Sequence, residues 1–117
     1  MAETTQLELV TPAGVMLSKS VEMVVIPGSE GLFGVLANHA PVLANLQRGV
    51  VEVHEGEKII DRIMIYGGVA DVTAHGVTIL AERAENLDTA SSQEVRERAL
   101  SSTGVDAEFL NIVAEAI

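Results

Sequence analysis

The feature that most constrains this chain is a series of short strand patterns, each closed by a turn, that runs to about Glu82. Gln6–Val10 and Val50–His54 alternate apolar and polar residues with a period of two, which is typical of half-buried strands. Glycine or proline stands at most of the breaks between these runs. Many short strands at this spacing, with no helical periodicity between them, favour an antiparallel sandwich or barrel.

Individual strands can be placed within this series. The turn at Glu55-Gly56-Glu57 separates Val50–His54 from Lys58–Tyr66, so we expect these two runs to form a hairpin. Val15–Ile26 is predicted to be one long extended segment that ends at Pro27-Gly28. Several runs of the chain, such as Met23–Ile26, are apolar on both faces. A strand of that kind lies deep in a core or presents its outer face to a partner.

The periodicity changes after Ala84, and Glu82–Asp88 is the predicted boundary between two parts. Ser91 and Glu94 have the spacing of a capping box, which predicts a short helix to about Leu100. Residues 101–104 break that helix. Apolar residues then recur at helical spacing and predict a second amphipathic helix; they are Val105, Phe109, Ile112, Val113 and Ala116. Helices this short are marginal in water unless packed, so we expect a hairpin folded on itself or on the strands.

Composition excludes several functions. The net charge of −10 argues against nucleic acid and anionic lipid as partners, because both are bound through clustered Lys and Arg. No apolar run reaches the roughly 18 residues that a membrane helix needs, and the first residues resemble neither a signal nor a transit peptide. We therefore expect a soluble protein with no direct membrane insertion. The absence of cysteine excludes disulfides and thiolate chemistry.

The sequence predicts no catalytic, metal or nucleotide site, and no cofactor. His39, His54 and His75 fall in or beside three different turns without metal-ligand spacing, so they are interpreted as turn or surface residues. No Gly-x-Ser-x-Gly motif supports a serine nucleophile. The glycines of 28–31 and 67–68 do not precede a helix, so they are predicted to supply positive φ in turns rather than to bind phosphate.

One segment resembles a known family. Residues 27–41 read PGSEGLFGVLANHAP, with a glycine-acid-glycine turn, a short apolar strand and then His-Ala-Pro. This looks like the signature loop of F-type ATP synthase epsilon subunits of the bacterial type. The resemblance continues in order through Arg48-Gly49-Val50, Tyr66-Gly67-Gly68 and Val77–Glu82. It implies a mainly β fold with a small α appendage: an antiparallel β-sandwich of about ten strands in residues 1–87 and a short helical hairpin in 88–117.

The resemblance also implies a role and its surfaces. Such a subunit is a non-catalytic part of the central stalk, monomeric when isolated, that joins the gamma subunit to the c-ring and couples proton flow to ATP synthesis. It lies on the cytoplasmic face of the bacterial inner membrane. By position, one turn would face the c-ring, and its Glu30 would pair with an arginine of a c-ring loop. This turn comprises Ser29, Glu30, Gly31, Leu32 and Phe33. Residues near gamma would be Thr11, His39, Ala40, Pro41, Leu43 and Ala44.

The helical hairpin departs from the family pattern. It is shorter than usual, and the second helix has no Lys or Arg, so we expect it to inhibit ATP hydrolysis weakly or not at all, with contact to the catalytic beta subunits left open. Two other functions remain as alternatives: a free-standing sandwich that binds another protein or a small ligand, and, more remotely, a small metal-dependent enzyme. Co-purification with gamma would favour the rotor subunit over the free-standing sandwich. Metal analysis of the purified protein tests the metal-dependent enzyme.

We predict that the isolated chain binds ATP weakly or not at all. Some family members bind ATP through Ile/Leu-Asp-x-x-Arg-Ala, whereas this chain has Leu87 and Asp88 followed by Ser91 and Ser92 in the last two places. A serine hydroxyl cannot reproduce the bidentate, charge-assisted contacts of a guanidinium with phosphate. Arg83, Arg96 and Arg98 are the side chains that could compensate. Calorimetric titration checks this, and micromolar affinity would contradict it.

Overall fold

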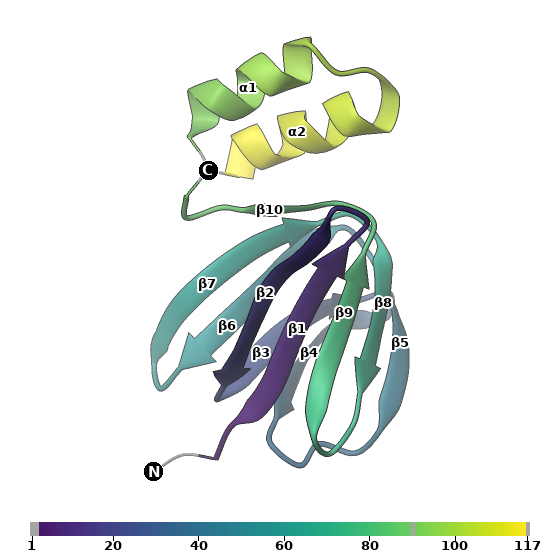
Figure 1. Ribbon diagram of the computed structural model, residues 1–117, viewed down its shortest axis with the longest axis vertical. Coiled ribbons are helices and arrows are strands. Elements are labelled where there is room, and N and C mark those ends of the chain that lie inside the picture. Colours follow the sequence, from purple (N-terminus) through teal and green to yellow (C-terminus); the bar gives the residue numbers. More distant parts are fainter. Residues whose placement is uncertain (1–2, 90, 117) are drawn as a thin grey trace.

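The computed structural model describes residues 3–89 and 91–116, which contain ten strands followed by two helices (Figure 1). The strands are β1 (Thr5–Thr11), β2 (Gly14–Val21), β3 (Met23–Gly28), β4 (Gly31–Leu36), β5 (Val42–Leu46), β6 (Gly49–Glu55), β7 (Lys58–Ile65), β8 (Gly68–Val72), β9 (Gly76–Ala81) and β10 (Ala84–Asn86). The helices are α1 (Ser92–Leu100) and α2 (Gly104–Ala116). The predicted mainly β fold with a small helical appendage is confirmed.

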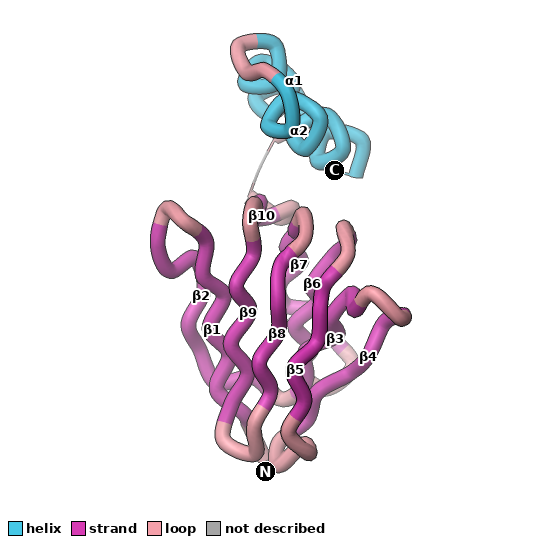
Figure 2. Tube along the Cα trace, turned by 90° about the vertical axis from the view of Figure 1, so that its right-hand side faces the viewer, coloured by secondary structure: helices cyan, strands magenta, loops and turns pink. Residues whose placement is uncertain are grey.

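The strands form one curled sheet in two layers. Its order is β10-β7-β6-β3-β5-β8-β9-β1-β2, with β4 paired to the free side of β3. Figure 2 shows β2, β1, β9, β8 and β5 side by side in one layer, with the helices beyond the end where β10 lies. The two layers join where β3 meets β5 through the single residue pair Gly28–Leu46. The opposite side is linked by an ion pair between Lys19 on β2 and Asp61 on β7, at 2.6 Å.

The core lies between the layers and is almost entirely aliphatic. Along strands such as β1, β8 and β9 alternate residues point inward, so the period of two in the sequence becomes one buried and one outward face. Six of the largest side chains are fully or almost fully buried: Leu7, Leu9, Ile26, Ile63, Ile65 and Ile79. Phe33, which is only partly buried, packs at the rim of this cluster.

Two predictions about the strands need correction in detail. Val15–Ile26 is not one extended segment, because β2 ends at Val21 and β3 begins at Met23 in the other layer. Glu22 lies at the crossing, and its carboxylate accepts a hydrogen bond from Gly56 N at 3.2 Å. The sheet is also not purely antiparallel, since β1 and β9 pair in parallel. Both features come from pairing between distant segments, which no local pattern records. The predicted β6–β7 hairpin is present.

The two helices pack on each other and on one end of the sandwich. Ser91 caps α1 as predicted, its hydroxyl accepting from Glu94 N at 3.1 Å. The buried face of α2 is shifted from the predicted stripe: Leu110 and Ala114 are buried beside the expected Phe109 and Val113, whereas Val105 is 42% exposed. The shift arises because α1 and the sandwich cover two adjacent sides of α2. The buried face of α2 is therefore wider than the single apolar stripe that was predicted.

A glycine at the start of β8 is required for the layer to close. Gly68 has φ 135°, and a Cβ there would lie 2.1 Å from the carbonyl oxygen of Leu80 on the neighbouring strand. Gly14 has a similar φ of 128°, but a Cβ there would have no neighbour within 4 Å. Comparison of the two sites therefore separates backbone strain from steric overlap.

We predict that Gly68→Ala lowers the free energy of unfolding by more than about 3 kcal/mol, from strain and overlap together. Gly14→Ala, the matched control, should lose only the strain contribution of about 1–3 kcal/mol. Urea unfolding followed by circular dichroism measures both. Equal losses in the two variants would show that the overlap with Leu80 is relieved without cost.

Candidate functional site

The predicted turn meets three of the residues predicted to lie near gamma, His39, Leu43 and Ala44, at one hollow. β3 and β4 form a hairpin whose turn is Ser29-Glu30, and β5 lies against the end of β3. The backbone fixes this junction, because Ser29 N donates to Asn45 O at 2.9 Å and Gln47 N donates to Pro27 O at 3.0 Å. The hollow between the turn and β5 has a volume of about 560 Å³. Its lining comprises Gly28, Ser29, Glu30, Gly31, Leu32, Phe33, His39, Val42, Leu43, Ala44 and Asn45.

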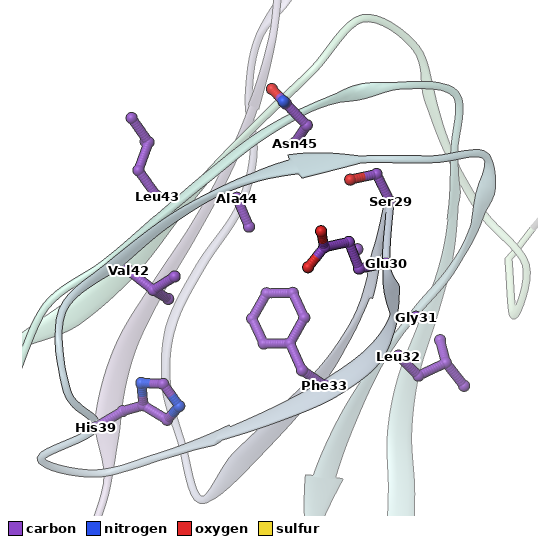
Figure 3. A pocket seen from close by; sticks show the side chains of 11 residues that line it. Ser29, Glu30, Gly31, Leu32, Phe33, His39, Val42, Leu43, Ala44 and Asn45 are labelled. Carbon is purple, nitrogen blue, oxygen red and sulfur yellow. The ribbon is translucent and has the colours of Figure 1, made fainter.

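The side chains of this hollow divide into two directions. Figure 3 shows the Phe33 ring and the Glu30 carboxylate directed into it, with His39 at its mouth. Leu32 and Leu43 point away, and they are 71% and 73% exposed. The hollow therefore combines an aromatic face with a carboxylate, while its rim carries exposed leucines. An aromatic face beside a carboxylate is suited to a cationic side chain.

Two local features hold the aromatic ring and the imidazole in place. A Cβ at Gly28 would lie 3.0 Å from the edge of the Phe33 ring, so the glycine leaves the room that the ring occupies. His39 Nδ1 lies 2.6 Å from Ala40 O. Because a carbonyl oxygen only accepts, this contact requires that His39 Nδ1 carry the hydrogen.

Not every residue predicted to be near gamma lies at this hollow. Ala40 and Pro41 are exposed in the β4–β5 loop next to it but do not line it. Thr11 lies at the other end of β1, beside the helices, where its hydroxyl accepts from Ala13 N at 3.2 Å. The predicted set is therefore spread over one layer of the sandwich rather than gathered in one patch.

A row of apolar side chains on the outer face of that layer was not predicted. Cross-strand pairing places four residues next to one another: Val15 on β2 opposes Val10, Val10 opposes Leu80, and Leu80 opposes Val69. Val15 is 64% exposed and Leu80 is 53% exposed. We call these four residues the outer apolar row. The sequence carried a weak signal for it, since Ile79 and Leu80 are consecutive apolar residues and only one of them can point inward.

A second hollow, of about 500 Å³, lies between the sandwich and the helices. Two ion pairs cross it, from Arg83 to Asp106 at 2.5 Å and from Arg98 to Glu85. The hydrogen bond to Asp106 raises the pKa of Arg83 above its ordinary value, and the hydrogen bond to Glu85 raises the pKa of Arg98. These two guanidinium groups, named above as possible phosphate ligands, are thus engaged by carboxylates.

The remaining features relevant to ATP lie beside this hollow. Leu87 is buried against the helices, and Asp88 accepts two hydrogen bonds from Arg62, at 3.1 and 3.2 Å.

Within residues 3–89 and 91–116, no three His, Asp or Glu side chains gather closely enough to hold a metal ion. Neither of the two helices in this part of the chain has the length and apolar character needed to cross a bilayer.

Comparison with known proteins identifies the family. The family described as "ATP synthase, Delta/Epsilon chain, beta-sandwich domain" matches residues 4–87. The ATP synthase epsilon chain of Hyphomonas neptunium is 50% identical over 95 residues, which are 81% of this chain and 70% of that protein. The epsilon chain of Paramagnetospirillum magneticum is 42% identical and aligns with all of this chain and 96% of that protein.

A solved structure agrees with these sequence matches. A chain of the Euglena gracilis mitochondrial ATP synthase, in a structure of its OSCP, F1 and c-ring, superposes with a TM-score of 0.68 and 29% identity. The superposition covers 96% of this chain and 73% of the Euglena chain. The chain described here therefore belongs to the family of ATP synthase epsilon chains.

Proposed function

We propose that this chain is a non-catalytic rotor subunit that joins the gamma subunit to the c-ring in the central stalk of a bacterial F-type ATP synthase. It would work at the cytoplasmic face of the inner membrane as a peripheral component and couple proton flow to ATP synthesis. Family membership supports the assignment to ATP synthase, and the related Euglena chain comes from an assembly that includes F1 and the c-ring. The observation that carries the finer proposal is the outer apolar row.

The outer apolar row suits an interface that transmits force. Its four side chains lie on four neighbouring strands and continue the register of the sheet, so the surface beneath them is rigid. Burial of a large aliphatic side chain contributes about 1.5–3 kcal/mol, which favours a partner surface over water. Thr11 follows Val10 at the end of β1, and Leu43 lies on β5 in the same layer. We propose that gamma covers this layer.

The hollow beside the Ser29-Glu30 turn suits the second partner. We propose that a polar c-ring loop docks there, with a cationic side chain placed between Glu30 and the Phe33 ring. An exposed ion pair of this kind contributes roughly 0–1 kcal/mol, so it would set the register of the contact more than its strength. His39 lies at the mouth of this hollow.

We predict that Leu80→Lys lowers the affinity for gamma by at least about tenfold, since it places a charge in an apolar interface. Ile59→Lys is the matched control, because Ile59 is 46% exposed on β7 in the other layer and the change in net charge is the same. Glu30→Lys should leave gamma binding intact and reduce retention of the c-ring. Pull-down of assembled complex with each tagged variant measures both partners. Equal loss of gamma in the Leu80 and Ile59 variants would refute the assignment of faces.

We also predict that the helical hairpin inhibits ATP hydrolysis weakly or not at all. The described residues of α2 include Asp106, Glu108 and Glu115 but no Lys or Arg, so approach to an acidic segment of a catalytic subunit is repulsive. Arg98 of α1 is already paired with Glu85.

Deletion of residues 89–117 should therefore change the hydrolysis rate of the assembled complex by less than about twofold, which is under half a kcal/mol in the barrier. Steady-state ATPase assays of complexes with the full and shortened chain, at equal subunit content, test this. A several-fold rise on deletion would show that the hairpin is an effective inhibitor.

A further inference from the structure

The edges of the sheet are protected unequally. On one side of the sandwich, the edge strands β2 and β7 carry charged side chains, and Lys19 of β2 reaches Asp61 of β7 at 2.6 Å. On the other side lies the edge strand β4 (Figure 2), which reads Gly-Leu-Phe-Gly-Val-Leu and has neither a charged residue nor a proline. Charged residues and proline are common means of preventing an exposed strand edge from pairing with another chain. β4 lacks this protection.

The two-residue turn before β4 fixes which of its backbone groups face outward. The residue pair that closes the Ser29-Glu30 turn is hydrogen-bonded, so the next pair, Pro27 and Leu32, is not. The Pro27 carbonyl agrees with this, because it accepts from Gln47 N at 3.0 Å on the side away from β4. The N–H and C=O groups at the free edge therefore belong to alternate residues: Leu32, Gly34 and Leu36.

The same three residues form an open surface. Among residues 3–89 and 91–116, β4 pairs with no strand except β3, and no turn or loop backbone bonds to its outward groups. Leu32 is 71% exposed and Leu36 is 57% exposed. Between them, a Cβ on Gly34 would meet only Met23 Sδ, at 3.6 Å. The edge thus offers backbone pairing groups together with open space above a glycine that two leucines flank.

Charge indicates which kind of chain fits this edge. Two copies of β4 paired about Gly34 would place Glu30 of one copy opposite Asn38 of the other. The Asn38 amide donates to Glu3 at 3.0 Å, so two carboxylates would approach each other, and each chain already has a net charge of −10. A second copy is therefore disfavoured, whereas a cationic segment would be attracted to Glu30.

We propose that the β4 edge binds an extended segment of another polypeptide, which adds to the sheet as an antiparallel strand. An aromatic side chain of that segment lies over Gly34, and a Lys or Arg lies opposite Glu30. In antiparallel register the cation follows the aromatic residue by four positions. Backbone pairing supplies affinity in this mode of recognition, and side chains at alternate positions supply specificity. An aromatic residue across from a strand glycine also provides contact that the glycine lacks.

The inference goes beyond the proposed function, because it concerns the backbone edge of β4 rather than gamma or the c-ring. It is tested on the isolated chain, so its failure would leave the assignment of those two partners untouched.

The test uses the peptide acetyl-Thr-Val-Tyr-Val-Thr-Val-Lys amide and NMR of the full chain. The amide hydrogens of Leu32, Gly34 and Leu36 should exchange rapidly in the free chain and at least about tenfold more slowly at saturation with peptide. The amides of Phe33 and Val35, which face β3, should exchange slowly in both states. The control peptide carries an N-methyl group on its second threonine, which removes one backbone donor and changes no side chain. It should bind at least about fivefold more weakly.

Variants of the chain test each contact. Gly34→Val fills the space over the glycine, so it should weaken the tyrosine peptide at least about tenfold and hardly affect a peptide with alanine in that place. Leu36→Lys gives β4 the charge that it lacks and should weaken binding about tenfold. Leu100→Lys is the matched control, since Leu100 is 88% exposed on α1 and the change in net charge is the same. Glu30→Gln should cost roughly two- to fivefold, and only for a peptide that carries lysine.

Each outcome decides the proposal. Slower exchange of the three outward amides, lost with the N-methylated peptide and in Leu36→Lys, supports strand addition. Changes confined to Ser29 and Glu30 would mean that the peptide enters the hollow without pairing, and the proposal fails. Absence of binding at about 1 mM peptide, or equal affinity of the N-methylated peptide, also overturns it. Protection of the same amides at high protein concentration without peptide would show that a second copy occupies the edge, contrary to the proposal.

Discussion

The architecture depends on the passage of β3 from one layer to the other. Met23–Val25 pair with β6, while Gly28, at the end of the same strand, pairs with Leu46 of β5. Gly28 is buried, and it has no side chain to obstruct either the backbone of Gly31 or the Phe33 ring. This one corner curls the sheet, encloses the aliphatic core and brings the β3–β4 turn next to β5. Closure of the sandwich therefore also forms the candidate site.

A different kind of interaction attaches the helices. The layers of the sandwich share a continuous buried cluster, whereas the helices meet the strands through a few apolar side chains and reciprocal ion pairs. Dispersion and burial are insensitive to salt, but exposed ion pairs are not. The two parts of this small chain are therefore expected to respond differently to a change of ionic strength.

The surface of the sandwich is divided in a way that fits two partners. One outer face carries the outer apolar row, which continues over neighbouring strands and lies on a rigid sheet. The hollow at the Ser29-Glu30 turn is smaller and mixed in character, with an aromatic ring and a carboxylate. An apolar face favours a permanent contact. A small polar contact contributes less to affinity and instead fixes how the two partners are aligned. This division of the surface supports the proposal of two partners made above.

The sequence by itself determined the local structure and the family. Period-two runs and turn glycines predicted the strands, the Ser91 cap predicted the first helix, and the segment from Pro27 to Pro41 indicated the epsilon family, because each of these signals is carried by neighbouring residues. Only the tertiary structure decided what distant segments do together. It split Val15–Ile26 between two layers, paired β1 with β9 in parallel, and aligned Val10 with Leu80 in an exposed row. It also moved Thr11 away from His39 and engaged Arg83 and Arg98 with carboxylates. Register and long-range ion pairs depend on which strands become neighbours, and that choice is made by closure of the whole core rather than by any local pattern.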